Sequence, residues 1–156
     1  MRTLRNILDD GGGVLYTLQQ TATVTDAATL MEKHNVGIVA VLDGQKLVGV
    51  VSERDIVRRV VGPHRDPSGT RLQEIMTTNV VVSPEDEDYR SAIRKLDHAN
   101  IRHLPVVRGD LVVSMLSIRD LIRVDMERMD EEIKFLHAYL YQVPPPDPGA
   151  GGQGKK

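Results

Sequence analysis

One stretch of this sequence occurs twice at a fixed distance, and that repetition limits the folds that are open to the chain. The eight residues from Val48 to Asp55, VGVVSERD, recur 65 positions further on as VSMLSIRD, from Val113 to Asp120. In both copies an apolar run ends at a Ser, and an Asp follows three positions later. This pattern predicts a strand that leads directly into a helix.

The same register extends well beyond the motif without a gap. Asn35 aligns with Asn100, and Gly44 aligns with Gly109. A repeating unit of about 65 residues is a small domain and not one turn of a solenoid, so the chain is a tandem pair. Each half alone would bury too little apolar surface to be stable, and we therefore expect the two halves to pack against each other.

Apolar periodicity and turn residues divide both copies into the same order of elements. The first copy is predicted to contain a helical turn at Leu4 to Leu8, a strand at Val14 to Leu18, a helix from about 26 to 34, strands at Val36 to Leu42 and Lys46 to Val51, and a closing helix at Glu53 to Val61. The second is predicted to contain a helical turn at Leu72 to Met76, a strand at Val80 to Val82, a helix from about 88 to 99, and strands at Ile101 to Val107 and Leu111 to Leu116. Thr25 and Asp26 provide N-cap chemistry for the first long helix, and Asn35 and Asn100 predict left-handed helix ends.

The closing helix of the second copy is predicted to continue past the repeat, from Ile118 to about Gln142. Its apolar residues follow a heptad-like spacing of 4, 3, 4, 3 and 4 positions: Ile122, Met126, Met129, Ile133, Leu136 and Leu140. The Pro- and Gly-rich segment 143–156 is predicted to be disordered. The expected organisation is a first repeat over 1–62, a linker over 63–71, a second repeat over 72–125, a helical extension over 126–142 and a tail over 143–156. The fold class is α/β, of the α+β kind.

Composition removes several classes of function. The chain of 156 residues has no Cys, which removes disulfides, thiolate metal sites and Cys nucleophiles. The five His residues form no metal-ligand spacing, so no metal site is expected. A net charge of −2 and an aromatic content of 3% argue against nucleic acid as a partner. No apolar run reaches the length of a membrane span and no signal peptide is present, so we expect a cytoplasmic protein with no membrane partner.

The repeated Ser-x-x-Asp admits two interpretations. A Ser at a helix N-cap with a carboxylate three positions later is the outline of a capping box, which needs no ligand. A strand that leads into a helix N-terminus is also an anion site, at which a hydroxyl binds phosphate and an Asp accepts from the two ribose hydroxyls. Arg54 and Arg58 lie four positions apart on one predicted helix, and Arg119 and Arg123 repeat this spacing, so each site has guanidinium groups for phosphate.

The two motifs, together with Arg102-His103-Leu104-Pro105-Val106, resemble a CBS-domain pair, or Bateman module. The match covers about residues 1–125 and is most similar to the small stand-alone bacterial CBS-pair proteins. The resemblance implies a pseudo-twofold pair of repeats, each a small sheet with two helices, with two clefts that bind adenosine nucleotides. It also implies homodimers in which two pairs meet through their helices.

Carried over by position, the resemblance implies nucleotide-binding roles for residues of both repeats. Asp55 and Asp120 would hold ribose, and Ser52 and Ser117 would hold phosphate, with Arg54, Arg58 and Arg119 beside them. One adenine pocket would be lined by Tyr16, Leu18, Ile38 and Val39, and the other by Val81, Val82, His103 and Pro105, with Arg102 adjacent.

Two positions depart from the family pattern. Ser114 stands where the family usually has Gly, as it does at Gly49, and its side chain is expected to crowd backbone that approaches the ligand. Repeat one has Gly37 and Ile38 in place of Arg102 and His103, and so lacks two potential phosphate donors. The two clefts are therefore expected to differ.

The sequence predicts a non-enzymatic regulatory module that senses an adenosine nucleotide: AMP, ADP, ATP or NAD. No catalytic residue or catalytic cofactor is expected, because Ser52 and Ser117 have the same helix-cap explanation and no general base accompanies either one. The alternative is a structural dimerisation module without ligand. Expected partners are the nucleotide, a second copy of the chain and a regulated protein that the sequence does not name.

Overall fold

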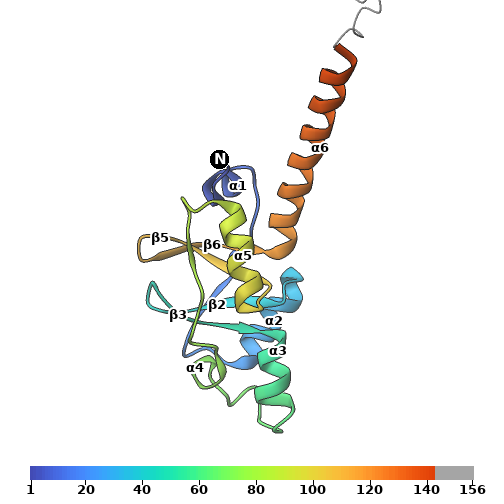
Figure 1. The fold of residues 1–156 in the computed structure, drawn as a ribbon. Helices are drawn as coiled ribbons and strands as arrows, with labels where there is room; N and C mark the ends of the chain where they lie inside the picture. Colours follow the sequence, from blue (N-terminus) through green and yellow to red (C-terminus); the bar gives the residue numbers. More distant parts are fainter. Residues whose placement is uncertain (143–156) are drawn as a thin grey trace, which may run out of the picture. The chain divides into compact units, whose positions relative to one another are not determined.

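A computed structural model of the chain describes residues 1–142 (Figure 1). It divides into two units, Met1–Leu121 and a second unit that begins at Ile122. The elements of the first repeat are α1 (Leu4–Asp9), β1 (Thr17–Gln19), α2 (Val24–His34), β2 (Ile38–Asp43), β3 (Lys46–Ser52), α3 (Glu53–Ile56) and η1 (Val57–Val61). Those of the second are α4 (Leu72–Ile75), β4 (Ser83–Pro84), α5 (Tyr89–Ala99), β5 (His103–Arg108), β6 (Leu111–Ser117) and α6 (Ile118–Gln142).

Each repeat contains one small sheet of three strands. The orders are β1-β2-β3 and β4-β5-β6, with the first pair parallel and the hairpin antiparallel in both sheets. Gly44 and Gly109 occupy the hairpin turns at φ values of 62° and 59°, a left-handed conformation that costs Gly little. The two hairpins lie side by side through β3 and β6 (Figure 1). The predicted tandem α+β fold is confirmed.

The short helices α1 and α4 pack on the repeat opposite to the one they precede in sequence. In α1, the Leu4 and Arg5 amides donate to the carbonyls of Glu87 and Glu85 at 2.9 and 2.6 Å, both in repeat two. The Leu72 amide of α4 donates to the Ala22 carbonyl of repeat one at 2.8 Å. The side chains of Leu4 and Leu72 are fully buried at these two docking points. The chain therefore exchanges its two short helices between the repeats.

The helices α2 and α5 begin and end at residues whose side chains or backbone conformations cap a helix. Both end at an Asn in the left-handed conformation, Asn35 at φ 52° and Asn100 at φ 50°, which confirms the predicted stops. The predicted start of α2 was wrong by two residues. Thr23 is the N-cap and Asp26 is the third helical residue, and the two form a capping box with bonds of 2.9 and 3.2 Å. Asp26 therefore closes the cap and does not open the helix.

Other predicted boundaries also differ from the structure, and β2 and β5 begin two residues later than expected. β1 and β4 begin about three residues later than expected. The residues before β1 bond instead to the other repeat, because the Val14 amide donates to the Met115 carbonyl at 3.0 Å. The closing helix of repeat one is α-helical only to Ile56 and then continues as a π-helical turn, in which the Gly62 amide donates to the Val57 carbonyl at 2.8 Å.

The helix α6 is one continuous helix of 25 residues, as its apolar spacing predicted. No helix among residues 1–142 combines the length and the apolar content needed to cross a bilayer. The predicted disordered tail, 143–156, lies outside the described residues.

A buried carboxylate holds α1 on repeat two. Glu85 is 5% exposed and accepts bonds from Arg108 at 2.7 and 2.8 Å and from Arg5 at 2.9 Å. The hydrogen bonds from Arg108, followed by those from Arg5, outweigh the effect of burial and lower the pKa of Glu85 to about 2. Glu85 is therefore ionised in the folded protein throughout the physiological range.

We predict that Glu85→Gln removes a stabilisation that depends on pH. The folded-state pKa of about 2 lies below the value of about 4.3 for a Glu in an unfolded chain, so the carboxylate stabilises the fold fully above pH ~4.5. This contribution is lost as the pH falls from ~4.5 toward 2. Urea denaturation between pH 7 and pH 2 should therefore show a gap between wild type and Glu85→Gln that closes in acid. Asp86→Asn, an exposed neighbour, is the control, and a gap of constant size would contradict the prediction.

Candidate functional site

A cavity of about 420 Å³ opens between the two repeats, and we call it the inter-repeat cavity. It is lined by Val14, Tyr16, Asn35, Val36, Gly37 and Ile38 from repeat one and by Arg102, His103, Met115, Ser117, Ile118, Arg119 and Asp120 from repeat two. Its volume falls within the usual range for small-molecule sites. The lining combines one largely apolar wall with one that carries charge.

The charged wall is built on the first turn of α6. The Ser117 hydroxyl and amide both donate to Asp120 Oδ2, at 2.7 and 2.8 Å, and the Asp120 amide donates back to Ser117 Oγ at 3.2 Å. This is a capping box. The other carboxylate oxygen, Asp120 Oδ1, has no hydrogen-bond or ion-pair partner within residues 1–142. It can therefore accept a hydrogen bond from a ligand.

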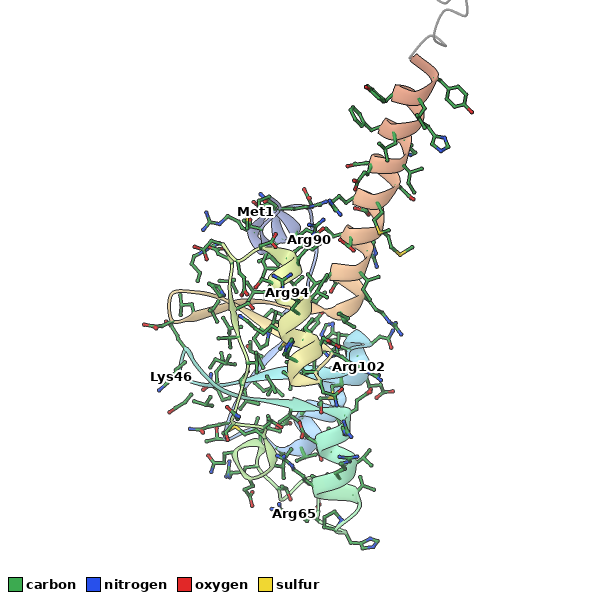
Figure 2. All side chains as sticks on the ribbon, in the orientation of Figure 1. Met1, Lys46, Arg65, Arg90, Arg94 and Arg102 are labelled. Atoms are coloured by element: carbon green, nitrogen blue, oxygen red, sulfur yellow. The ribbon has the colours of Figure 1, made fainter. Side chains whose placement is uncertain are left out.

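Arg102 and His103 lie beside this turn: His103 is the first residue of β5 and Arg102 precedes it, labelled in Figure 2. The Ile118 amide donates to the Arg102 carbonyl at 2.8 Å, and His103 is the cross-strand partner of Ser117. Burial is the main cause that lowers the pKa of His103; Asp120 and Glu53 act in the opposite direction, and Arg102 lowers it further. At neutral pH His103 is therefore an uncharged imidazole with one N–H to donate, and Arg102 supplies positive charge.

The apolar wall comes from repeat one. The ring of Tyr16 stacks on the ring of His34, with 4.2 Å between centroids and an interplanar angle of 22°. This stack fixes one face of Tyr16. Asn35 ends α2 in the left-handed conformation, so the chain turns sharply and Gly37 and Ile38 follow at the cavity edge. A flat apolar group suits this wall.

The structure brings together seven of the residues that the sequence predicted, namely Tyr16, Ile38, Arg102, His103, Ser117, Arg119 and Asp120. The structure groups these residues differently from the sequence-based prediction. The prediction places Tyr16 and Ile38 in a different adenine pocket from His103, and the structure has all three lining the same cavity. The reason is that the segment before β1 bonds across to β6 and so carries Tyr16 to the motif of repeat two.

Several predicted residues lie elsewhere. Val39 is fully buried in the core of repeat one, and Leu18 packs against that core. Pro105 is buried within β5. The remaining predicted residues, Ser52, Arg54, Asp55, Arg58, Val81 and Val82, do not line the inter-repeat cavity.

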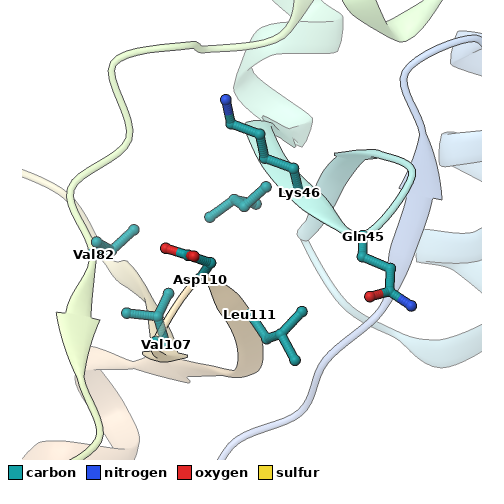
Figure 3. Close-up of a pocket in the computed structure, with 8 residues that line it drawn as sticks. Gln45, Lys46, Val82, Val107, Asp110 and Leu111 are labelled. Carbon is teal, nitrogen blue, oxygen red and sulfur yellow. The ribbon is translucent and has the colours of Figure 1, made fainter.

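Val82 instead borders a second cavity, of about 660 Å³, which lies at the two hairpin turns (Figure 3). Val107 and Leu111 of the second hairpin and Lys46 of the first are among its other lining residues. Val81 is not among the residues that line either cavity.

Residues that the sequence did not predict as ligand-binding complete the inter-repeat cavity: Val14, Asn35, Val36, Gly37, Met115 and Ile118. The sequence predicts Asn35 only as a left-handed helix stop, and the structure confirms that conformation. This predicted stop is the one signal in the sequence for a sharp turn next to the cavity.

The Ser at position 114 does not crowd this cavity. It is buried and faces Gly13, which has φ 78° and no room for a Cβ beside Ser114 Oγ. At the equivalent place in repeat one, a Cβ on Gly49 would lie 2.7 Å from Met76 Sδ and 2.9 Å from the Thr77 carbonyl oxygen. In each repeat a glycine allows a strand and the segment beside it to approach closely. The glycine is Gly49 of β3 in repeat one, and in repeat two it is Gly13 of the segment that bonds to β6. Because Gly13 has no side chain, the Ser114 hydroxyl fits beside it, and the predicted crowding does not occur at the cavity.

The motif of repeat one forms the same capping box. The Ser52 amide and hydroxyl donate to Asp55 Oδ2 at 2.9 and 3.1 Å. Here, however, Asp55 Oδ1 is also occupied, since the Thr77 hydroxyl donates to it at 3.2 Å. Arg59 Nε lies 3.9 Å from the same oxygen.

Within residues 1–142, no group of three or more His, Asp or Glu side chains is arranged to hold a metal ion. The polar groups of the inter-repeat cavity suit an organic ligand with hydroxyl and anionic groups, because carboxylate, hydroxyl and guanidinium groups lie on one wall.

The family model for the CBS domain matches residues 14–62 and 72–127. A CBS domain-containing protein of Bacillus subtilis, YhcV, is 31% identical over 105 residues, which cover 67% of this chain and 74% of that protein. The mitochondrial protein CBSX3 of Arabidopsis thaliana is 34% identical over 124 residues, or 76% of this chain, but the match covers only 60% of CBSX3.

Solved structures agree with this family. A protein of Burkholderia ambifaria described as a signal-transduction protein with CBS domains is 32% identical, with a TM-score of 0.75 over 81% of this chain and 95% of that one. The CBS domain pair of protein MJ0100 is 26% identical, with a TM-score of 0.71 over 82% of this chain and 98% of that one. That structure is a complex with 5′-methylthioadenosine and S-adenosyl-L-methionine. The match of both repeats to the family model, together with the structural similarity to solved CBS-domain proteins, establishes that this chain belongs to the CBS-domain family and carries a tandem CBS pair.

Proposed function

We propose that this CBS pair binds an adenosine nucleotide (AMP, ADP, ATP or NAD) in the inter-repeat cavity and acts as a non-enzymatic regulatory module. The observation that carries the proposal is the free Asp120 Oδ1, held by the capping box at the edge of a cavity that both repeats line. A carboxylate with a free oxygen suits the hydroxyls of a ribose. The two ligands in the MJ0100 complex are both 5′-substituted adenosines, which supports the same chemistry here.

The other groups of the cavity fit the rest of a nucleotide. Arg102 and Arg119 supply guanidinium groups for phosphate, next to the N-terminus of a 25-residue helix, where free amides and the helix dipole favour an anion. The apolar wall at Tyr16 and Ile38 accepts a base. A nucleotide would span the cavity, with its base on repeat one and its phosphate on repeat two.

The competing proposal is a structural module without ligand. It rests on the capping boxes, because Ser52 with Asp55 and Ser117 with Asp120 already satisfy backbone groups at two helix starts. The free Asp120 Oδ1 and the charged residues around it are what this alternative leaves unexplained. The proposed setting is the cytoplasm, and the proposed partner is a regulated protein that responds to the nucleotide.

We predict that AMP, ATP or NAD raises the melting temperature of the purified protein. A ligand that binds only the folded state adds about 2.7 kcal/mol of stability at a hundredfold excess over its dissociation constant. Differential scanning fluorimetry with millimolar nucleotide measures the shift, and native mass spectrometry detects nucleotide that co-purifies. Adenosine and inorganic phosphate, each alone, are the controls for the two halves of the ligand. If no nucleotide shifts the melting temperature, the structural module is the better explanation.

We also propose that the chain forms a homodimer to which α6 contributes. Beyond Leu121 this element is a single helix, and a single helix cannot cover its own apolar side chains. Its apolar residues at heptad-like spacing, from Ile122 to Leu140, form a stripe that we call the seam. Met126, Ile133 and Leu140 occupy the a positions of this heptad pattern. Burial of each large side chain would contribute roughly 1.5–3 kcal/mol.

Charge on the flanks of the seam makes this dimer sensitive to salt. In a parallel pair Asp125 would face Asp130 of the other copy, and in an antiparallel pair the two copies of Asp130 and of Glu132 would face each other. Like charges at such positions repel by a few tenths of a kcal/mol, and salt screens them. Added salt should therefore strengthen the self-association.

We predict that Ile133→Asp converts the dimer to a monomer and that Glu131→Ala, on the opposite side of the helix, leaves it dimeric. Sedimentation velocity at ~0.05 and ~0.5 M NaCl measures both variants and the salt response of the wild type. A shortened protein that ends near Met126 lacks most of the seam, and we expect it to be monomeric as well. If the Ile133→Asp protein and the shortened protein stay folded and remain dimeric, α6 is not part of the interface.

A further inference from the structure

The two motif carboxylates perform the same task with one oxygen and different tasks with the other. Asp55 Oδ2 and Asp120 Oδ2 both accept from the amide and the hydroxyl of their own N-cap Ser, at distances between 2.7 and 3.1 Å. The cap therefore does not distinguish the repeats. Any difference in ligand binding has to come from the Oδ1 atoms and from what surrounds them.

The Oδ1 of Asp55 is part of a network that fastens the segment after α4. Thr77 donates its hydroxyl to this oxygen at 3.2 Å, and the Thr77 backbone exchanges two hydrogen bonds with Val50 of β3, at 2.9 and 3.0 Å. Arg59, 3.9 Å from the same carboxylate oxygen, donates to the carbonyls of Ile75 and Met76 at 2.7 and 3.1 Å. Asp55 thus joins α3, β3 and the chain that leaves α4.

The repeat-two motif lacks each partner in this network. The position 65 residues after Arg59 is Val124, which has no charge. The segment that bonds to β6 as Thr77 bonds to β3 contains Gly13 and Val14, neither of which has a hydroxyl. Asp120 Oδ1 consequently has no hydrogen-bond or ion-pair partner within residues 1–142, and Asp120 lines the inter-repeat cavity.

Local charge also separates the two motifs. The residue after the N-cap Ser is Glu53 in repeat one and Ile118 in repeat two. The Glu53 carboxylate lies over Gly37, where an added Cβ would be 3.1 Å from Glu53 Oε2. The N-cap Ser is therefore followed by a carboxylate in repeat one and by an uncharged side chain in repeat two, while Arg54 and Arg119 match. Because Gly37 and His103 line the inter-repeat cavity, the Glu53 carboxylate also lies near that cavity, and the difference between the motifs rests on the Oδ1 atoms.

We infer that the chain binds one nucleotide per CBS pair, at the repeat-two motif, and that Asp55 is a structural residue that fixes the segment after α4. This inference rests on the proposed function and specifies which carboxylate serves it. A ribose at Asp55 would have to displace the Thr77 hydroxyl and compete with Arg59, whereas a ribose at Asp120 displaces no protein group.

Isothermal titration calorimetry of the full chain with AMP, ATP and NAD tests the inference through a matched pair of variants. Asp55→Ala and Asp120→Ala remove the same cap, so each is the control for the other. We expect one site per wild-type chain. Asp120→Ala should weaken binding at least about tenfold, which is the loss typical for a hydrogen bond to a charged group. Asp55→Ala should change the affinity by less than about twofold, within the spread of independent sites.

Thermal denaturation without ligand should show the opposite order. Asp55→Ala loses the cap and the Thr77 contact, and it should melt at a lower temperature than Asp120→Ala, which loses only the cap. Thr77→Val keeps the volume and the cap, so it should lower the melting temperature without changing binding. It replaces Asp55→Ala in the titration if that variant does not fold.

The possible results distinguish a failure of the inference from a failure of the proposed function. Two sites per wild-type chain, or equal losses of affinity in Asp55→Ala and Asp120→Ala, overturn the inference and leave the proposed function standing. If the wild type binds none of the three nucleotides, the proposed function is overturned and the inference with it. Weaker binding in Thr77→Val would assign Thr77 to a ligand site and also overturn the inference.

Discussion

The crosswise docking of α1 and α4 is the constraint on which the rest of the structure depends. Because α1 lies on repeat two, the chain must return to repeat one before β1 can pair with β2. Val14 bonds to Met115 of repeat two, and two residues later the Tyr16 carbonyl accepts from Ala40 of repeat one. This crossing puts Val14 and Tyr16 opposite Asp120. The inter-repeat cavity therefore depends on the path of the segment before β1 as well as on the Ser117–Asp120 motif.

A duplicated motif can keep its sequence while its copies take up different physical tasks. The Ser-x-x-Asp caps are retained in both repeats because a helix begins at each of them, and the cap stabilises that start whether or not a ligand binds. The second carboxylate oxygen is not needed for capping, so its use is set by neighbours that differ between the repeats. Thr77 and Arg59 occupy it in repeat one, and nothing in the described chain occupies it in repeat two.

The fold could be predicted well from the sequence because it is governed by local patterns that occur twice. The hairpins, the Asn helix stops and the length of α6 all follow from turn residues and apolar spacing within single segments. The helix exchange could not be predicted in this way. Leu4 and Leu72 have the same apolar pattern whichever repeat they pack on, so their sequence does not name a partner.

The same limit applies to the candidate site. Most of the charged wall lies within one short stretch, from Ser117 to Asp120, so the sequence allowed an anion site there as one of two interpretations. The apolar wall joins Tyr16 and Ile38 to that stretch across about a hundred residues of sequence, and no local pattern indicates that Tyr16 shares a cavity with His103. The role of Thr77 was equally hidden, because a Thr after a short helix has no feature that points to an Asp 22 positions earlier.

The exchange of the short helices also means that the unit which repeats in sequence is not the unit that folds. A cut in the linker at 63–71 would give one fragment with α1 but without α4 and another with α4 but without α1. Each fragment would expose the surface that the missing helix covers. During synthesis, repeat one is incomplete until α4 has left the ribosome, while α1 waits for β4 and α5, about eighty residues later, before its buried side chains have a partner. A circular permutation that places α1 after repeat two would make each half contiguous.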